Sequence, residues 1–94
     1  MIIEFDPAKS ARNVRERGLS FESAGDFDFA SAMMREDIRK AYSEQRLVAL
    51  GFLDARLHVL CFTPVKDGIR VISFRKANRR EEHAYEKAFV HGGQ

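Results

Sequence analysis

The chain has 94 residues and a net charge of +2, from 16 Lys and Arg against 14 Asp and Glu. Because domains run to roughly 100–200 residues, this length predicts a single domain, over residues 1–91, with a frayed tail at 92–94. Hydrophobic residues make up 45% of the chain and include eight Phe, which excludes a disordered chain and provides for one packed core. So weak a net charge neither requires nor excludes a nucleic-acid partner.

Cysteine and histidine usage argues against a metal or disulfide framework. Cys61 is the single cysteine, so an internal disulfide and a Cys-based zinc site are excluded, and the thiol is expected to be buried. The three histidines show no metal-ligand spacing, so we expect no metal and no cofactor. No apolar run approaches the roughly 18 residues of a membrane span, and no signal peptide is recognisable. The sequence therefore predicts a cytoplasmic protein without a membrane partner.

The first element is a short strand over residues 1–5, followed by a sharp helix start. Asp6 is a suitable N-cap, and Pro7 suits the first helical position because its missing N–H would be unpaired there. A helix over about 7–17 follows, and Gly18 is its stop signal.

The next segment carries weaker signals. Ser20 is a helix N-cap, which predicts a second helix to about residue 32, although Gly25 weakens it. Residues 33–46 follow neither a helical nor a strand period, and we expect an exposed strand or a loop there.

Three closely spaced strands are predicted over residues 47–53, 57–63 and 69–75. Asp67 and Gly68 tolerate the positive φ angles of a hairpin turn between the last two strands. Pro64 lacks the N–H that a central ladder needs, so the second strand is expected to stop before it.

The last element is a helix over about 79–90. Asn78 followed by Glu81 forms a capping box, in which each side chain binds the other residue's backbone N–H. Its apolar residues are expected to pack on the sheet: Ala84, Tyr85, Ala88 and Phe89. The order β-α-α-β-β-β-α predicts a two-layer α+β domain, an antiparallel sheet of about four strands with three helices.

Positive charge concentrates in residues 70–80, which carry five basic groups and no acid. Strict alternation in this strand places Ser73 and Arg75 on one face, with Phe74 on the other. A surface that binds an anion is therefore expected around this segment.

The start of the last helix adds to this expectation. Arg79 and Arg80 oppose the helix dipole, an unfavourable arrangement that a bound phosphate would relieve. The alternative is a solvated basic surface, or one paired with Glu81 and Glu82.

Four short motifs span almost the whole chain, and the last is the most specific. They are Phe5-Asp6-Pro7-Ala8-Lys9 with Asn13, Arg17-Gly18-Leu19-Ser20-Phe21, Arg46 with Gly51, and Arg70-Val71-Ile72-Ser73-Phe74-Arg75-Lys76-Ala77 with Arg80, Glu81 and Tyr85. On these motifs the sequence resembles the BrnT family of bacterial toxins, small ribonucleases of type II toxin–antitoxin systems with a RelE-like fold.

The resemblance implies that the chain cleaves RNA, in the cell mRNA, without a metal and so inhibits translation. The ribose 2′-OH would attack the adjacent phosphate, and the guanidinium groups of arginines would stabilise the negative charge of the transition state. Arg75 and Arg80 are the expected clamps, and Tyr85, Glu81 and His83 are candidates for proton transfer. Further substrate contacts are expected from Lys9, Arg46, Arg79 and Ser73.

The resemblance also implies a partner, a BrnA-type antitoxin with a ribbon-helix-helix part, through which DNA would be bound indirectly. Two departures from the family pattern, Arg17 in place of His and Phe74 in place of a small residue, keep a second hypothesis open. In that case the chain is a non-catalytic binding module, either a corepressor that binds the antitoxin or a degenerate toxin. A third hypothesis is an RNA-binding domain that does not cleave.

Overall fold

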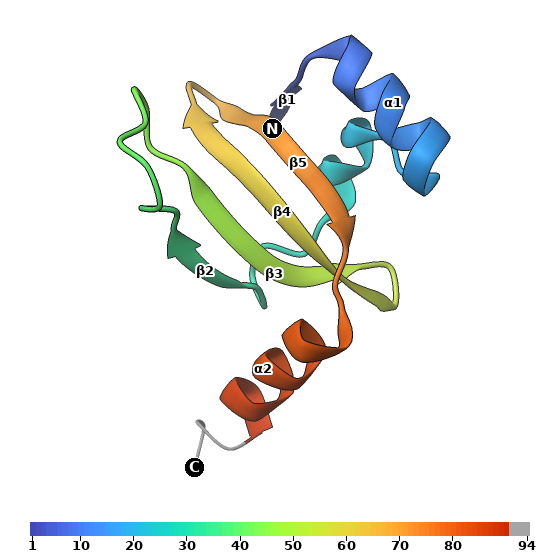
Figure 1. Ribbon diagram of the computed structural model, residues 1–94, viewed down its shortest axis with the longest axis vertical. Helices are drawn as coiled ribbons and strands as arrows, with labels where there is room; N and C mark the ends of the chain where they lie inside the picture. The colour runs from blue at the N-terminus through green and yellow to red at the C-terminus, as the bar shows by residue number, and fades with distance from the viewer. Residues whose placement is uncertain (91–94) are drawn as a thin grey trace.

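The computed structural model describes residues 1–90, and the predicted frayed tail at 92–94 lies outside them. Figure 1 shows a curved sheet with one helix near its upper end and another beyond its lower end. In chain order the elements are β1 (Ile2–Glu4), α1 (Pro7–Arg17), a 3-10 helix η1 (Phe21–Asp26), β2 (Met33–Glu36), β3 (Leu47–Leu53), β4 (Arg56–Val65), β5 (Gly68–Lys76) and α2 (Arg79–Val90).

The sheet has five strands in the order β1-β5-β4-β3-β2, and it is mixed, not purely antiparallel with four strands as predicted. Strands β2 to β5 form an antiparallel meander, whereas β1 pairs with β5 in parallel. A parallel partner can only be reached through a long connection, here the whole chain between β1 and β5, so no local pattern reveals it. The α+β class and the helices at both ends of the chain are confirmed.

The second predicted helix is a single short 3-10 helix that ends at Asp26, not at residue 32. Ser20 caps it as expected, because its hydroxyl accepts the N–H of Glu22 at 3.2 Å. Beyond it, the carboxylate of Asp28 accepts the N–H of Ala30 at 3.1 Å and the hydroxyl of Ser31 at 2.7 Å. This local turn competes with helix formation and explains why the helix stops.

Strand β4 continues through Pro64 to Val65, which corrects the expected end at Thr63. The pairing of β4 with its neighbours explains why the strand tolerates Pro64, because β3 begins at Leu47 opposite Phe62. Beyond Phe62 the only neighbour of β4 is β5, where Pro64 lies opposite Ile69. Pro64 is therefore at a local sheet edge, where a missing N–H is harmless.

A β-bulge in β5 breaks the predicted alternation. Phe62 lies opposite Val71 and Cys61 lies opposite Ser73, so Ile72 is the extra residue. As a result Val71 and Phe74 both point into the core, whereas the simple alternation put them on opposite faces. Ser73 and Arg75 still share a face, because their partners on β4 are two residues apart.

The main core lies on the sheet face covered by η1. It combines aromatic and aliphatic side chains of η1 and the sheet, with edge-to-face contacts between Phe rings: Phe21, Ala24, Phe27, Ala49, Leu53, Leu60, Phe62, Ile69, Val71 and Phe74. No helix within residues 1–90 is long and apolar enough to cross a membrane.

The opposite face, which we call the open face, is only partly covered. A smaller buried cluster of Leu57, Val59 and Ala77 lies there, with Tyr85 packed against it. The prediction that Ala84, Ala88 and Phe89 pack on the sheet is wrong, since both alanines are exposed and Phe89 is half exposed. Figure 1 shows the reason, because α2 extends beyond the end of the sheet.

Candidate active site

Two rows of side chains cross the open face from β5 to β2. The strand registers align Arg75, Val59, Leu50 and Met33 in one row, and Ser73, Cys61, Val48 and Arg35 in the next. Residues directly opposite each other in a sheet point to the same side, so both rows lie on the open face. An apolar floor is thus framed by Arg75 at one side and Arg35 at the other.

Arg75 forms a closed ion pair with Glu81, in the first turn of α2. Nη1 and Nη2 of Arg75 each donate to one carboxylate oxygen of Glu81 at 2.8 Å. The predicted capping box is present as well, because Glu81 accepts the N–H of Asn78 and its own N–H is accepted by Asn78, both at 2.8 Å. The hydrogen bonding from Arg75 lowers the pKa of Glu81, and the same interaction raises the pKa of Arg75.

Among residues 1–90 the ion pair leaves one edge of the Arg75 guanidinium without a partner. A guanidinium carries five N–H donors. Three of them are used, two by Glu81 and one by the carbonyl of Lys76 at 3.2 Å. The two that remain, on Nε and Nη2, point the same way and form a fork that matches two phosphate oxygens. Glu81 therefore orients Arg75 without consuming its capacity to bind an anion.

The backbone beside Arg75 is held from the other side by Asn13 of α1. The Asn13 amide donates to the carbonyl oxygens of Phe74 and Leu19, each at 2.9 Å. One side chain thereby ties α1, the segment before η1 and the residue preceding Arg75. This explains in physical terms why Asn13 belongs to a recognisable motif.

Three other predicted residues lie close in the chain to the Arg75–Glu81 pair. Arg79 and Arg80 are exposed in the first turn of α2, next to Glu81, and form no ion pair within residues 1–90. Ser73 is exposed on the open face, opposite Cys61.

Tyr85 lies one turn beyond Glu81 and is engaged in packing. Its hydroxyl donates to the carbonyl of Ser31 at 2.8 Å. Its ring lies edge-on to Phe52, with centroids 5.4 Å apart, and stacked on Phe89, at 4.5 Å. These contacts fix α2 on the sheet, and proton transfer by Tyr85 would require the bond to Ser31 to break. His83 is exposed on the same helix.

Lys9 and Arg46 share no hydrogen bond or ion pair with Arg75 within residues 1–90. Lys9 is exposed on α1, one turn before Asn13, whose amide binds the Phe74 carbonyl beside Arg75. Arg46 is stacked over the ring of Tyr42, 4.1 Å from its centroid, at the end of the loop that precedes β3.

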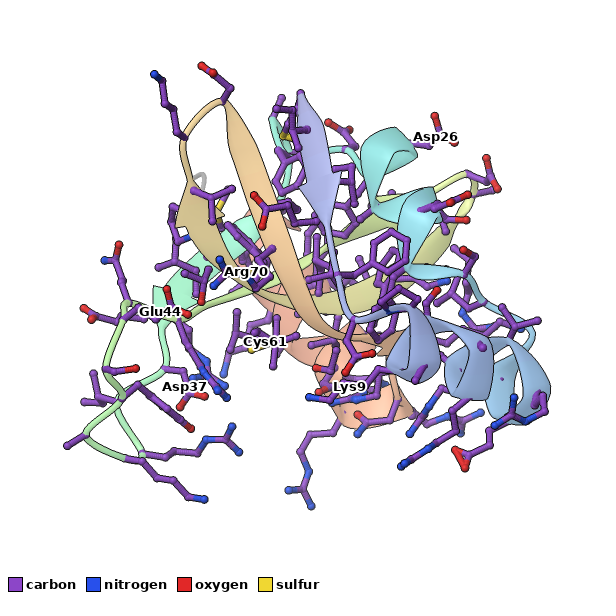
Figure 2. All side chains as sticks on the ribbon, turned by 90° about the horizontal axis from the view of Figure 1, so that it is seen from above. Lys9, Asp26, Asp37, Glu44, Cys61 and Arg70 are labelled. Atoms are coloured by element: carbon purple, nitrogen blue, oxygen red, sulfur yellow. The ribbon has the colours of Figure 1, made fainter. Side chains whose placement is uncertain are left out.

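The loop of residues 37–46 is an ordered feature that sequence patterns did not indicate. The Asp37 side chain is fully buried and pairs with Arg39 at 2.7 Å, which holds the pKa of Asp37 well below its usual range. Glu44 binds Arg70 of β5 at 2.7 Å. Figure 2 shows Asp37, Glu44, Cys61 and Arg70 grouped on one side of the sheet, with Asp26 on the other.

Arg35 and Cys61 are two further residues of the open face. Cys61 is buried as predicted, and burial raises the pKa of its thiol. Arg35 was not predicted, because β2 matches none of the four motifs and only its pairing with Val48 places it on this face. No group of three or more His, Cys, Asp or Glu side chains within residues 1–90 could hold a metal ion.

The comparison with known families identifies the class of protein. Residues 5–81 match the family model for a ribonuclease toxin of a type II toxin–antitoxin system. That family is BrnT, and because the match covers most of the chain, the chain belongs to it. No curated protein matches the sequence. The resemblance read from the motifs is thereby confirmed, and an antitoxin partner and an RNA target follow from the class.

Proposed function

We propose that the chain is a metal-independent endoribonuclease with a RelE-like single domain, and that it cleaves RNA at the Arg75–Glu81 pair. One observation carries the proposal, namely the free Nε and Nη2 edge of Arg75 beside the uncovered floor of the open face. Family membership supports the reaction class. The assignment of atoms to steps comes from the geometry of the pair.

Arg75 stabilises the charge that develops at phosphorus. In the reaction the ribose 2′-oxygen loses its proton and forms a bond to phosphorus, the bond to the 5′-oxygen breaks, and the leaving 5′-oxygen takes up a proton from water. The products are a 2′,3′-cyclic phosphate and a free 5′-hydroxyl. Negative charge accumulates on the two non-bridging oxygens, and a rigid two-pronged donor suits both of them. Arg80 and Arg79, exposed at the start of α2, bind the same or the adjoining phosphate.

Glu81 accepts the proton of the 2′-hydroxyl. The hydrogen bond from Arg75 lowers the pKa of Glu81, so the carboxylate is ionised at neutral pH. A phosphate on the free edge of Arg75 adds negative charge beside Glu81, so the basicity of Glu81 rises toward that of an ordinary carboxylate. Substrate binding would then make Glu81 a stronger base, whereas in the free protein its basicity stays low.

The antitoxin is proposed to be a BrnA-like protein that covers the open face and supplies the DNA contacts. The open face is the surface of the described residues where charged and apolar groups are left without a covering layer. A neighbouring gene for a short ribbon-helix-helix protein is the expected source of this partner.

The test is cleavage of RNA by the purified chain in the presence of EDTA. We expect cleavage with 2′,3′-cyclic phosphate ends, and growth arrest when the chain is produced alone. The double variant Arg75→Ala and Arg80→Ala should lose both, whereas Arg12→Ala and Arg15→Ala, exposed on α1, should keep both. A double variant at residues 75 and 80 that is as active as the parent would overturn the site.

A non-catalytic corepressor is the second candidate, favoured by the closed ion pair of Arg75 with Glu81. If that pair never opens, the chain would bind its antitoxin and repress without cleaving RNA. Intact RNA after incubation with the purified chain, together with tight antitoxin binding, would select this candidate.

A further inference from the structure

A groove on the open face lies directly beside the Arg75–Glu81 pair. It has a volume of about 230 Å³. Its lining combines the apolar floor with residues of β2 and α2: Met33, Met34, Arg35, Val48, Leu50, Val59, Glu81 and Ala84. Pockets for drug-sized ligands hold roughly 300–1,000 Å³, so this groove suits one flat ring system and not a larger ligand.

The side chains that line the groove suit a planar, partly polar group. Its walls are aliphatic and thioether side chains, of which Val59 is buried and Val48 and Leu50 are partly buried. Two charged side chains also line it, Glu81 on α2 and Arg35 on β2. The two are close enough for the charge of Arg35 to lower the pKa of Glu81.

The separation of the two arginines leaves room for a nucleotide between them. Arg75 on β5 and Arg35 on β2 are three strand spacings apart across the sheet and two residues apart along the strands, so their Cα atoms are roughly 16 Å apart. A phosphate on the free fork of Arg75 would therefore place the attached base over Val59 and Leu50, with its far edge toward Arg35. An arginine presents two donors in a plane, and guanine is the base with two acceptors, O6 and N7, in matching positions.

We propose that this groove is a base-binding subsite that selects guanine beside the cleaved phosphate, with Arg35 as the specificity-determining residue. The inference rests on the proposed function, because it takes the phosphate at Arg75 as the anchor. It adds a residue that no motif includes, and it makes cleavage sequence-dependent.

The experiment uses short RNAs that differ only in the base beside one cleavable position. Cleavage by the wild-type chain should favour guanine, and Arg35→Ala should reduce that preference about tenfold or more. Arg35 is exposed, so its loss should leave the fold intact, and Arg12→Ala on α1 is the matched control. Equal weakening for all four bases would overturn the inference, because it would assign Arg35 to a phosphate.

A second variant tests the groove itself. Ala84→Leu fills it from an exposed helix position, and Ala88→Leu, one turn later and outside the groove, is its control. We expect only Ala84→Leu to weaken binding of the same RNAs carrying a 2′-deoxy residue at the cleaved position. If both leucine variants bind RNA as the parent does and Ala84→Leu loses only the antitoxin, the groove belongs to a protein partner and the inference is wrong.

The two proposals fail in different ways. Absence of cleavage by the wild-type chain contradicts the proposed function, whereas the 2′-deoxy RNAs still report base preference through binding alone. Cleavage by the wild-type chain with no base preference contradicts only the subsite.

Discussion

Arg75 and Glu81 bind each other through two hydrogen bonds of 2.8 Å, and this pair joins the end of β5 to the first turn of α2. The two residues are only six apart, yet the turn between the elements aligns both guanidinium Nη atoms with both carboxylate oxygens. The pair gives Arg75 a single orientation and leaves the edge formed by Nε and Nη2 without a partner among residues 1–90. Most of the functional expectations for this toxin depend on that orientation.

Arg75→Lys should abolish most cleavage although it keeps the charge. A lysine ammonium is a point charge without the planar fork, so it cannot bind Glu81 and two phosphate oxygens together. Loss of one well-placed donor at an oxyanion costs roughly 100- to 1,000-fold in rate. Single-turnover cleavage with saturating protein measures the effect, and Arg12→Lys on α1 serves as the control. Wild-type rates for Arg75→Lys would show that charge alone is sufficient.

Glu81→Gln should destabilise the protein at neutral pH but not in acid. The folded-state pKa of Glu81 is lowered, so the pair contributes stability above the ordinary glutamate pKa, and this contribution is lost as the pH falls through the lowered value. Because both side chains are partly exposed, the loss at pH 7 should be about 0.5–1 kcal/mol. Urea unfolding at pH 7 and below pH 4 measures the difference, which should shrink in acid. Glu82→Gln, exposed in the same turn, should show no such pH dependence.

Asn13→Ala should weaken both stability and activity. The amide of Asn13 donates to two carbonyls, and without it the carbonyls of Phe74 and Leu19 lose these partners in a partly buried site. The expected cost is about 1–3 kcal/mol of unfolding free energy. Activity should fall at temperatures where the variant is still folded, because the strand end that carries Arg75 is released. Glu16→Ala, exposed on the same helix, is the control, and an Asn13 variant with parental stability would contradict the assignment.

Tyr85→Phe separates a packing role from proton transfer. The hydroxyl is bound to the Ser31 carbonyl, so its removal should cost about 0.5–1.5 kcal/mol of stability. The cleavage rate should stay within a few-fold of the parent, since Phe keeps the ring between Phe52 and Phe89. A rate reduced a hundredfold or more in a folded variant would instead make Tyr85 the proton donor.

Local signals in the sequence predicted the ends of helices and the turns well where a single residue determines the backbone conformation. Asp6 accepts the N–H of Ala8 at 2.9 Å as the N-cap of α1, and Gly18 ends that helix with a φ of 66°. The turn at Asp67, with a φ of 62°, was equally readable, as was the capping box of Asn78 with Glu81. In each case the competing conformations differ by interactions within a few residues.

The motif glycine Gly51 shows how a local pattern can have a distant cause. A Cβ at this position would lie 2.8 Å from Cζ of Phe27 and 2.9 Å from Cβ of Ala32. The segment after η1 therefore packs directly on the backbone of β3. The sequence indicated that a glycine mattered here, but the packing partner became visible only in the folded chain.

The sequence by itself determined the α+β class, the family and the residues that concentrate positive charge near the end of β5. Tertiary structure decided the parallel pairing of β1 with β5, the bulge at Ile72 and the position of Arg35 on the same face of the sheet as Arg75. These features depend on strand neighbours distant in the chain and on register, neither of which local propensity encodes. The physical reason is that a sheet aligns residues by hydrogen-bond pairing between strands, so the composition of a face follows from the partners each strand finds.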